Sequence, residues 1–183
     1  MSRRGSGRAS RQAGFSVIEI LIVVAIVLVV SAIAIPNLLR SRVASDEASA
    51  VGSLRTIMSA EASYKAMYGL GYTNDLISLG GTGTQASCNS ALLIDTSLAN
   101  GEKTGYRFKF TPGNTEFKPE TPVPQICTWG KADGYTIQAD PITTGKTGER
   151  HFCADASGVI RYDAQKQVGV TPPSCSSNAA PLQ

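Results

Sequence analysis

One acidic residue at the start of a long apolar run constrains this chain more than any other feature. Between Val17 and Leu39 the only charged side chain is Glu19, and the other polar side chains are Ser31 and Asn37. A helix needs about 20 apolar residues, each rising about 1.5 Å, to cross a hydrocarbon core of about 30 Å. The run is long enough, so the sequence predicts a membrane-spanning helix.

Basic residues in front of the run predict its direction. Residues 1–14 hold four arginines, at positions 3, 4, 8 and 11, and no acid. Positive charges beside a membrane helix stay in the cytoplasm. We therefore expect a single-pass membrane protein with a cytoplasmic N-terminus and an extracytoplasmic C-terminus.

An ordinary secretory signal is an alternative reading of the same run. Such a signal is cut after its apolar stretch at a small-x-small site, and Ala32-Ile33-Ala34 fits that pattern. Two features favour retention of the helix instead. Glu19 would place a charge in the apolar stretch, and Pro36-Asn37 leads into another helical pattern rather than into a loop.

Four residues at characteristic spacing identify a family resemblance. Gly14 is followed by Phe15, Glu19 comes four residues after Phe15, and Pro36 comes 21 residues after it. This pattern, within residues 11–39, resembles the leader and first helix of type IV pilins and of the related pseudopilins of secretion systems. The resemblance implies that a membrane peptidase, the prepilin peptidase and N-methyltransferase, cuts after Gly14 and methylates the new amino-terminus at Phe15.

The same resemblance divides the chain into three parts. Residues 1–14 would be a basic leader peptide, residues 15–39 a hydrophobic transmembrane and polymerisation helix, and residues 40–183 the C-terminal half of that helix with a globular extracytoplasmic pilin domain. Its partners would be further copies of itself in a helical homopolymer, the inner-membrane pilus assembly machinery, and membrane lipid before assembly.

The function implied is that of a structural subunit of a type IV pilus, displayed as a cell-surface filament and not acting as an enzyme. The globular domain would coat the filament and carry any adhesive property, whereas the sequence does not distinguish roles in motility, adhesion or secretion. A close alternative is a pseudopilin of a type II secretion system. A different class is a membrane-anchored extracytoplasmic binding domain in which Glu19 and Pro36 are incidental.

The carboxylate of Glu19 needs a physical reason. A charge at the centre of a bilayer costs roughly 2.5 kcal/mol or more. The positive end of the helix dipole stabilises an acid in the first turn by only about 0.3–1 kcal/mol. Cleavage after Gly14 would expose an ammonium group at Phe15, which could pair with Glu19 of a neighbouring helix shifted along the axis. We therefore favour pairing over the dipole alone, and expect assembly to depend on Phe15, Glu19 and Pro36.

Pro36 predicts a local change in the helix. A proline inside a helix removes one backbone donor and presses on the carbonyl four residues earlier, here that of Ala32, at a cost of about 3 kcal/mol. The sequence thus predicts a bend or a loosened turn between Ala32 and Pro36. Alternatively, Pro36 is the first-turn residue of a second helix, which would place a complete break there.

Beyond Pro36 the pattern becomes amphipathic. Apolar residues recur at steps of three and four among charged ones, and they predict a buried stripe made of Ala44, Ala48, Val51, Leu54 and Met58. Gly69 and Gly71 follow Met67, as glycines commonly do at helix C-termini. We therefore expect one long helix from Phe15 to Met67.

Strand patterns follow a loop-rich segment at residues 72–100. Tyr106, Phe108 and Phe110 alternate with basic residues, which indicates a half-buried strand. A second strand is expected over residues 135–139, ending before Pro141. Residues 150–162 have the form of a hairpin, and the tail after Val168 reads as irregular. The predicted fold is α+β, with the long N-terminal helix packed on a small antiparallel β-sheet.

Cys88, Cys127, Cys153 and Cys175 all fall in the part placed outside the cytoplasm. Four cysteines in an oxidising compartment predict disulfides, with three possible full connectivities. We prefer Cys88 with Cys127, and Cys153 with Cys175, because the second bond would tie the tail to the hairpin. A metal site is disfavoured, because there is no Cys-x-x-Cys pair and only one histidine, His151.

Charge and motif fragments indicate no cofactor. The net charge of +3 depends on the leader, because removing its four arginines turns 17 basic and 14 acidic side chains into 13 and 14. The mature chain would therefore have no global bias toward nucleic acid. Gly145-Lys146-Thr147 lacks the first glycine of a phosphate-binding loop, and the segment at residues 155–158 lacks the glutamate of a calcium loop. The resemblance to pseudopilins, some of which bind calcium near the C-terminus, leaves a calcium site there as an open alternative.

Overall fold

The computed structural model divides the chain into two compact units, residues 1–39 and residues 40–183. Each unit is described by itself below. The residues that the structure describes are 14–69, 71–81, 83, 85–114, 132–164, 167–171, 174–176 and 179–182.

The first unit contains the N-terminal part of α1, the helix Val17–Tyr68. Its most apolar 18-residue window has a mean hydropathy of 3.2, and none of that window is buried. By length and composition, α1 is able to cross a membrane. Among residues 17–39 only Ser31 is even partly buried, so the apolar surface of this segment is open on every side.

α1 continues through Pro36, which lies inside the helix. The alternative in which Pro36 begins a second helix after a break is therefore wrong. The helix is one element, as predicted, with an end one residue beyond Met67 and a start two residues after Phe15. Thr56 and Ser63 hydroxyls donate to carbonyls four residues earlier in its C-terminal half, at 3.0 and 2.9 Å.

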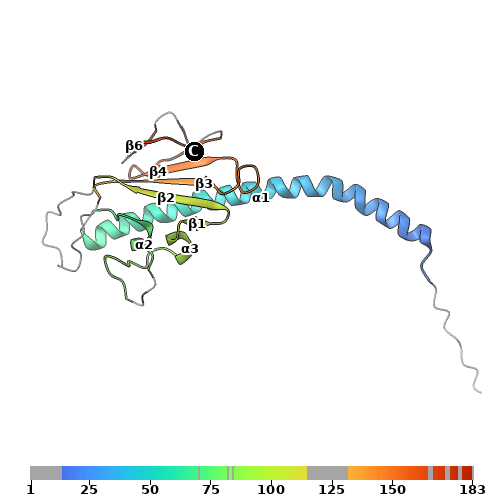
Figure 1. Ribbon diagram of the computed structural model, residues 1–183, viewed down its shortest axis with the longest axis horizontal. Helices are drawn as coiled ribbons and strands as arrows, with labels where there is room; N and C mark the ends of the chain where they lie inside the picture. The colour runs from blue at the N-terminus through green and yellow to red at the C-terminus, as the bar shows by residue number, and fades with distance from the viewer. Residues whose placement is uncertain are drawn as a thin grey trace, which may run out of the picture. The chain divides into compact units, whose positions relative to one another are not determined.

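In the second unit, one face of α1 lies against a six-stranded antiparallel sheet (Figure 1). The strands are β1 Glu102–Lys103, β2 Tyr106–Pro112, β3 Tyr135–Pro141, β4 His151–Asp155, β5 Ile160–Asp163 and β8 Ala180–Pro181, paired in that order. The predicted α+β fold, a long N-terminal helix packed on a small antiparallel sheet, is confirmed. β3 includes Pro141, which was expected to lie beyond its end.

The buried face of α1 differs from the predicted stripe. Leu54 is buried as expected, but Ala44 and Ala48 are exposed, and the stripe runs through Glu47, Ala50, Ser53, Leu54, Ile57, Ala60, Glu61 and Tyr64. The sequence-based prediction placed all charged residues of this part of α1 on its solvent-exposed face. Two of them, Glu47 and Glu61, are instead buried, because backbone N–H groups of the domain satisfy their carboxylates.

Glu61 ties the end of α1 to the segment that follows it. Its side chain is fully buried, and its carboxylate accepts hydrogen bonds from the backbone N–H of Thr73, at 3.0 Å, and from the Thr73 hydroxyl. Nearby, the Tyr64 hydroxyl donates to the carbonyl of Cys88 at 2.7 Å. Burial raises the pKa of Tyr64 well above its usual range, with the Glu61 charge adding to the effect.

Two short helices lie in the segment that was expected to be mostly loop. They are α2 Leu76–Leu79 and α3 Thr96–Ala99. Each begins after an aspartate, Asp75 or Asp95, whose carboxylate accepts a hydrogen bond from a backbone N–H of the first turn, at 2.7 and 3.0 Å respectively. The apolar patch between these helices contributes Ala91 and Ile94 to the core.

The sheet has a second, smaller apolar cluster on the face opposite the main core. Successive residues of a strand point to opposite faces. In β4, Phe152 and Ala154 belong to the main core, whereas Cys153 joins Val168, Cys175 and Ala179 in the smaller cluster. The C-terminal tail therefore covers the outer face of the sheet.

The tail is more regular than the sequence suggested. β6 Val170–Thr171 pairs with β7 Ser174–Cys175, and β8 pairs with β5 at the sheet edge. The expectation of an irregular tail was wrong for these short strands. Pro181 is tolerated because it lies in the edge strand, which has a neighbour on one side only.

A disulfide joins the tail to the sheet, as preferred from the sequence. Cys153 and Cys175 are bonded, with their Cα atoms 6.0 Å apart. Cys88 is also disulfide-bonded, and Cys127, the partner expected for it, lies outside the described residues. The carboxylate of Asp155 accepts from the backbone N–H of Cys175 at 2.9 Å. Burial disfavours this charge, but hydrogen bonds from Ser157 and Cys175 prevail and lower its pKa.

Removing the bond between Cys153 and Cys175 should weaken the domain. Serine at both positions should lower the free energy of unfolding by about 2–4 kcal/mol, because the unfolded chain regains loop entropy. Urea denaturation of the full-length protein in detergent, followed by circular dichroism, measures the change. An unchanged midpoint would show that the tail is held without the disulfide.

Candidate functional site

The junction between Gly14 and Phe15 lies at the accessible start of the described chain. Gly14 is exposed, and a Cβ added to it would meet no atom within 4 Å. Phe15 is 79% exposed. Both residues precede the first turn of α1, so the peptide bond between them is outside the helix. An enzyme could bind this segment in extended form without unwinding a helix.

Glu19 lies in the first turn of α1. Its backbone N–H donates to the carbonyl of Ser16 at 3.1 Å. The side chain is exposed, and within the part of the chain that the structure describes its carboxylate has no hydrogen bond or ion pair. Among the described residues, the helix N-terminus provides a favourable local field for this charge, which is a small effect. A single copy of this chain thus leaves Glu19 without a charged partner among its described residues.

Of the four residues predicted for processing and assembly, three lie close together. Gly14, Phe15 and Glu19 lie within about two helical turns, whereas Pro36 lies 17 residues beyond Glu19, or about 25 Å along a helix. The residues between are apolar on every face of the helix, with large side chains at least 48% exposed. A helix that is apolar all round is stable only inside a membrane or among other apolar helices.

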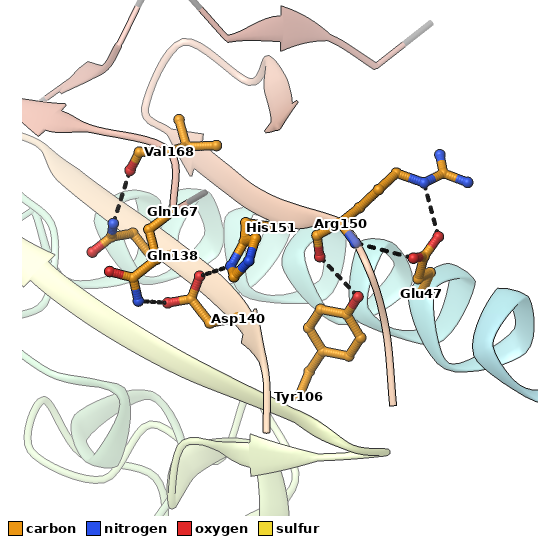
Figure 2. Close-up of polar contacts among 8 residues, drawn as sticks. All are labelled: Glu47, Tyr106, Gln138, Asp140, Arg150, His151, Gln167 and Val168. Carbon is orange, nitrogen blue, oxygen red and sulfur yellow. Dashed lines mark hydrogen bonds and ion pairs between the residues drawn. The ribbon is translucent and has the colours of Figure 1, made fainter. Parts of the chain in front are cut away.

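A clamp between α1 and the loop before β4 was not found from the sequence (Figure 2). One oxygen of Glu47 accepts a hydrogen bond from the backbone N–H of Arg150, at 3.1 Å, as Figure 2 shows. The same oxygen accepts from the backbone N–H of Glu149 at 2.9 Å. The other oxygen lies 2.8 Å from Arg150 Nε. Glu47 is buried while Arg150 is half exposed. The clamp fixes the domain to α1 eight residues after the apolar run ends.

Tyr106 completes this clamp from the sheet side. Its hydroxyl donates to the carbonyl of Arg150 at 2.9 Å. Gly148 lies so close to the Tyr106 ring that a Cβ there would come within 2.0 Å of the hydroxyl oxygen. Burial raises the pKa of Tyr106 well above its usual range, and the Glu47 carboxylate adds to the effect. The hydroxyl therefore remains a neutral donor at any physiological pH.

His151, the single histidine of the chain, lies beside Asp140 (Figure 2). Nδ1 of His151 is 2.7 Å from one Asp140 oxygen, and the other oxygen accepts from Gln167 Nε2 at 2.6 Å. Gln138 donates to the carbonyl of Val168 at 2.9 Å. This network attaches the start of the tail to β3 and β4. Its geometry indicates a structural role for His151.

The described residues include no group of three or more His, Cys, Asp or Glu side chains placed to hold a metal ion. In the segment that resembles part of a calcium loop, both oxygens of Asp155 accept backbone hydrogen bonds, from Ser157 and Cys175. A nearby hollow of about 380 Å³ is lined by Asp133, Asp155 and Arg161 among others. The carboxylate of Asp155 is thus engaged within the fold.

Comparison with known proteins identifies the N-terminal segment. Residues 9–35 match the sequence family described as the prokaryotic N-terminal methylation motif. The match includes Gly14, Phe15 and Glu19 and ends one residue before Pro36. The search of curated proteins and the search of solved structures each gave no match.

Loss of the Glu47 carboxylate should loosen the domain from α1. Glu47→Ala leaves two backbone donors without an acceptor, which costs about 1–3 kcal/mol of unfolding free energy. The ion pair with the half-exposed Arg150 adds little. Urea denaturation of the full-length protein measures the change. Glu149→Ala is the matched control, because that side chain is exposed, and equal midpoints for the two variants would contradict the clamp.

Proposed function

We propose that this chain, which carries the N-terminal methylation motif that marks type IV pilins and pseudopilins, is a prepilin whose mature form is a structural subunit of a type IV pilus. One observation carries the proposal. The matched segment, residues 9–35, coincides with the start of a helix whose apolar surface is open on all sides. A helix of this kind is stable inside a membrane or among other copies of the same helix, and a pilin subunit would use both environments.

Processing would occur at the exposed junction after Gly14. The prepilin peptidase and N-methyltransferase would remove the leader and methylate Phe15. Cleavage removes the four arginines of residues 1–14 and leaves one ammonium group at the new terminus. The mature chain then has a cytoplasmic end with little charge to hold it in the membrane, which favours extraction into a filament.

Before assembly, α1 would anchor the subunit in the inner membrane with its N-terminus in the cytoplasm. The disulfide between Cys153 and Cys175 supports an extracytoplasmic domain, because such bonds persist in oxidising compartments. The arginines of the leader support the same orientation. After assembly, the domain would lie on the filament surface.

In the filament, Glu19 would pair with the methylated ammonium of Phe15 in a neighbouring subunit. Holding the carboxylate alone in hydrocarbon costs roughly 2.5 kcal/mol or more. Pairing therefore stabilises a subunit whose helix is shifted along the axis so that its Glu19 meets the Phe15 ammonium of its neighbour. Pro36, which already removes one backbone hydrogen bond from α1, would let the helix loosen there during packing.

The proposed role is structural rather than catalytic and calls for no cofactor. The partners are further copies of the chain, the processing enzyme and the inner-membrane assembly machinery. The pseudopilin of a type II secretion system remains the alternative within the same motif class. It would use the same first helix and differ in the machinery that assembles it.

Glu19→Val tests the assembly step. The variant should insert and fold normally, because it removes a charge from the bilayer, but surface filaments should fall at least about tenfold, because losing one partner of a buried pair costs about 3–5 kcal/mol. Glu19→Asp should be intermediate, since its charge remains but reaches less far. Filaments sheared from cells and membrane-pool subunit are measured by quantitative immunoblot. Ser31→Val, a neutral change in the same segment, is the control and should assemble normally.

Two outcomes would count against the proposal. Normal filament yield from processed Glu19→Val would show that the carboxylate is dispensable and that the helix dipole is its only partner. A wild-type strain that shows no filaments of this chain, combined with a secretion defect on its deletion, would favour the pseudopilin.

A further inference from the structure

The loop between β3 and β4 carries exposed side chains that filament assembly through α1 does not use. Ile142, at the start of this loop, is 46% exposed although it is a large apolar residue. Lys146 is exposed at the tip of a turn in which Gly145 has a φ of 80°. Within the described part of the chain, the Lys146 ammonium has no hydrogen bond or ion pair. Exposed apolar and cationic side chains both favour contact with an anionic lipid surface.

Hydrogen bonds hold this loop beside residues 46–49 of α1, near the point where the helix enters the second unit. The loop ends at Arg150, whose backbone N–H donates to Glu47 at 3.1 Å (Figure 2). The loop begins at Ile142, whose N–H donates to Gly105 at 2.9 Å in the neighbouring turn. That turn also contacts α1, through a hydrogen bond of 3.0 Å between Ser49 and Thr104. The loop is thus held at both ends next to residues 46–49.

Only a short stretch of α1 separates the apolar run from the residues that hold the loop. The apolar run ends at Leu39, and Glu47 follows eight residues later, or about 12 Å along a helix. The headgroup layer of a bilayer is itself about 5–7 Å thick on each side. A helical tether of this length keeps Glu47 within about 12 Å of the end of the apolar run.

Charge on the same stretch of α1 fits an anionic surface. Arg40 and Arg42 follow the apolar run directly, both are exposed, and neither has an ion pair among the described residues. Together with Lys146 they are three basic side chains at the end of the domain that holds residues 46–49. Two acidic side chains, Asp46 and Glu149, lie at that end as well. Cations in this position are attracted by lipid phosphates within a Debye length.

We propose that Arg40, Arg42, Ile142 and Lys146 form a membrane-contact surface that binds the headgroups of anionic phospholipid while the subunit is anchored in the bilayer before assembly. This inference rests on the membrane anchoring in the proposed function. It adds a second contact, made by the globular domain itself, which must be released before the subunit enters a filament. Contact by Ile142 and Lys146 would also limit rotation of the domain about the helix axis.

Lipid photocrosslinking tests the membrane-contact surface on the full mature chain. A diazirine amino acid is introduced singly at Ile142, at Ile77 or at Val27, and the chains are reconstituted in vesicles of phosphatidylethanolamine with phosphatidylglycerol. Ile77 is the matched control, because it is an isoleucine with 64% exposure in α2. α2 begins shortly after Thr73, whose backbone N–H donates a hydrogen bond to Glu61. Glu61 lies about 21 Å further along α1 than Glu47, so Ile77 is held at a point of the helix more distant from the apolar run. Lipid adducts are counted by mass spectrometry.

Ile142 should form several-fold more lipid adduct than Ile77, and the excess should fall when Lys146→Gln is added or when phosphatidylcholine replaces the anionic lipid. Equal adduct at Ile142 and Ile77, with strong adduct at Val27, would overturn the membrane-contact surface and leave the proposed function intact. Absence of adduct at Val27 would overturn both, because the apolar run would then not lie in the bilayer.

Discussion

The structure depends on a helix segment that cannot be stable in water alone. Residues 17–39 are apolar on all sides, and the described chain buries almost none of them. Two environments satisfy such a surface, a bilayer and a bundle of like helices. Glu19 distinguishes these environments, because a carboxylate is costly in lipid but acceptable in a bundle that supplies an ammonium group. Under the proposed function, the same segment would serve as membrane anchor and as polymerisation surface.

The second half of α1 has a different task, which is to hold the domain rigidly. It does so with two buried carboxylates, Glu47 and Glu61, that accept hydrogen bonds from the backbone of the domain. A buried acid is favourable only when its acceptor capacity is used. These contacts define one register of the helix on the sheet, whereas an apolar stripe alone would tolerate sliding. A force applied along α1 would thus be transmitted to the domain through the hydrogen bonds of Glu47 and Glu61.

The sequence predicted the elements of this fold better than their contacts. The apolar run, the strand alternation that begins at Tyr106 and the hairpin at residues 150–162 are each visible as a local sequence pattern, and each is present. The buried face of α1 was misplaced because Glu47 and Glu61 were treated as solvent-facing. Their spacing from Leu54, seven residues on either side, matches the buried face, but nothing local shows which distant N–H groups will meet them. The tail strands were missed because two-residue strands carry no period.

The start of the mature chain is the most direct test of the account, because every step proposed for Glu19 requires an ammonium group at Phe15. The protein is purified from the cell envelope in detergent, and its intact mass and N-terminal peptide are measured. The account predicts a chain that begins at Phe15 and carries one methyl group on its terminal nitrogen. A chain that begins at Ile35, after the Ala32-Ile33-Ala34 site, would show that the apolar helix is discarded and would contradict the account.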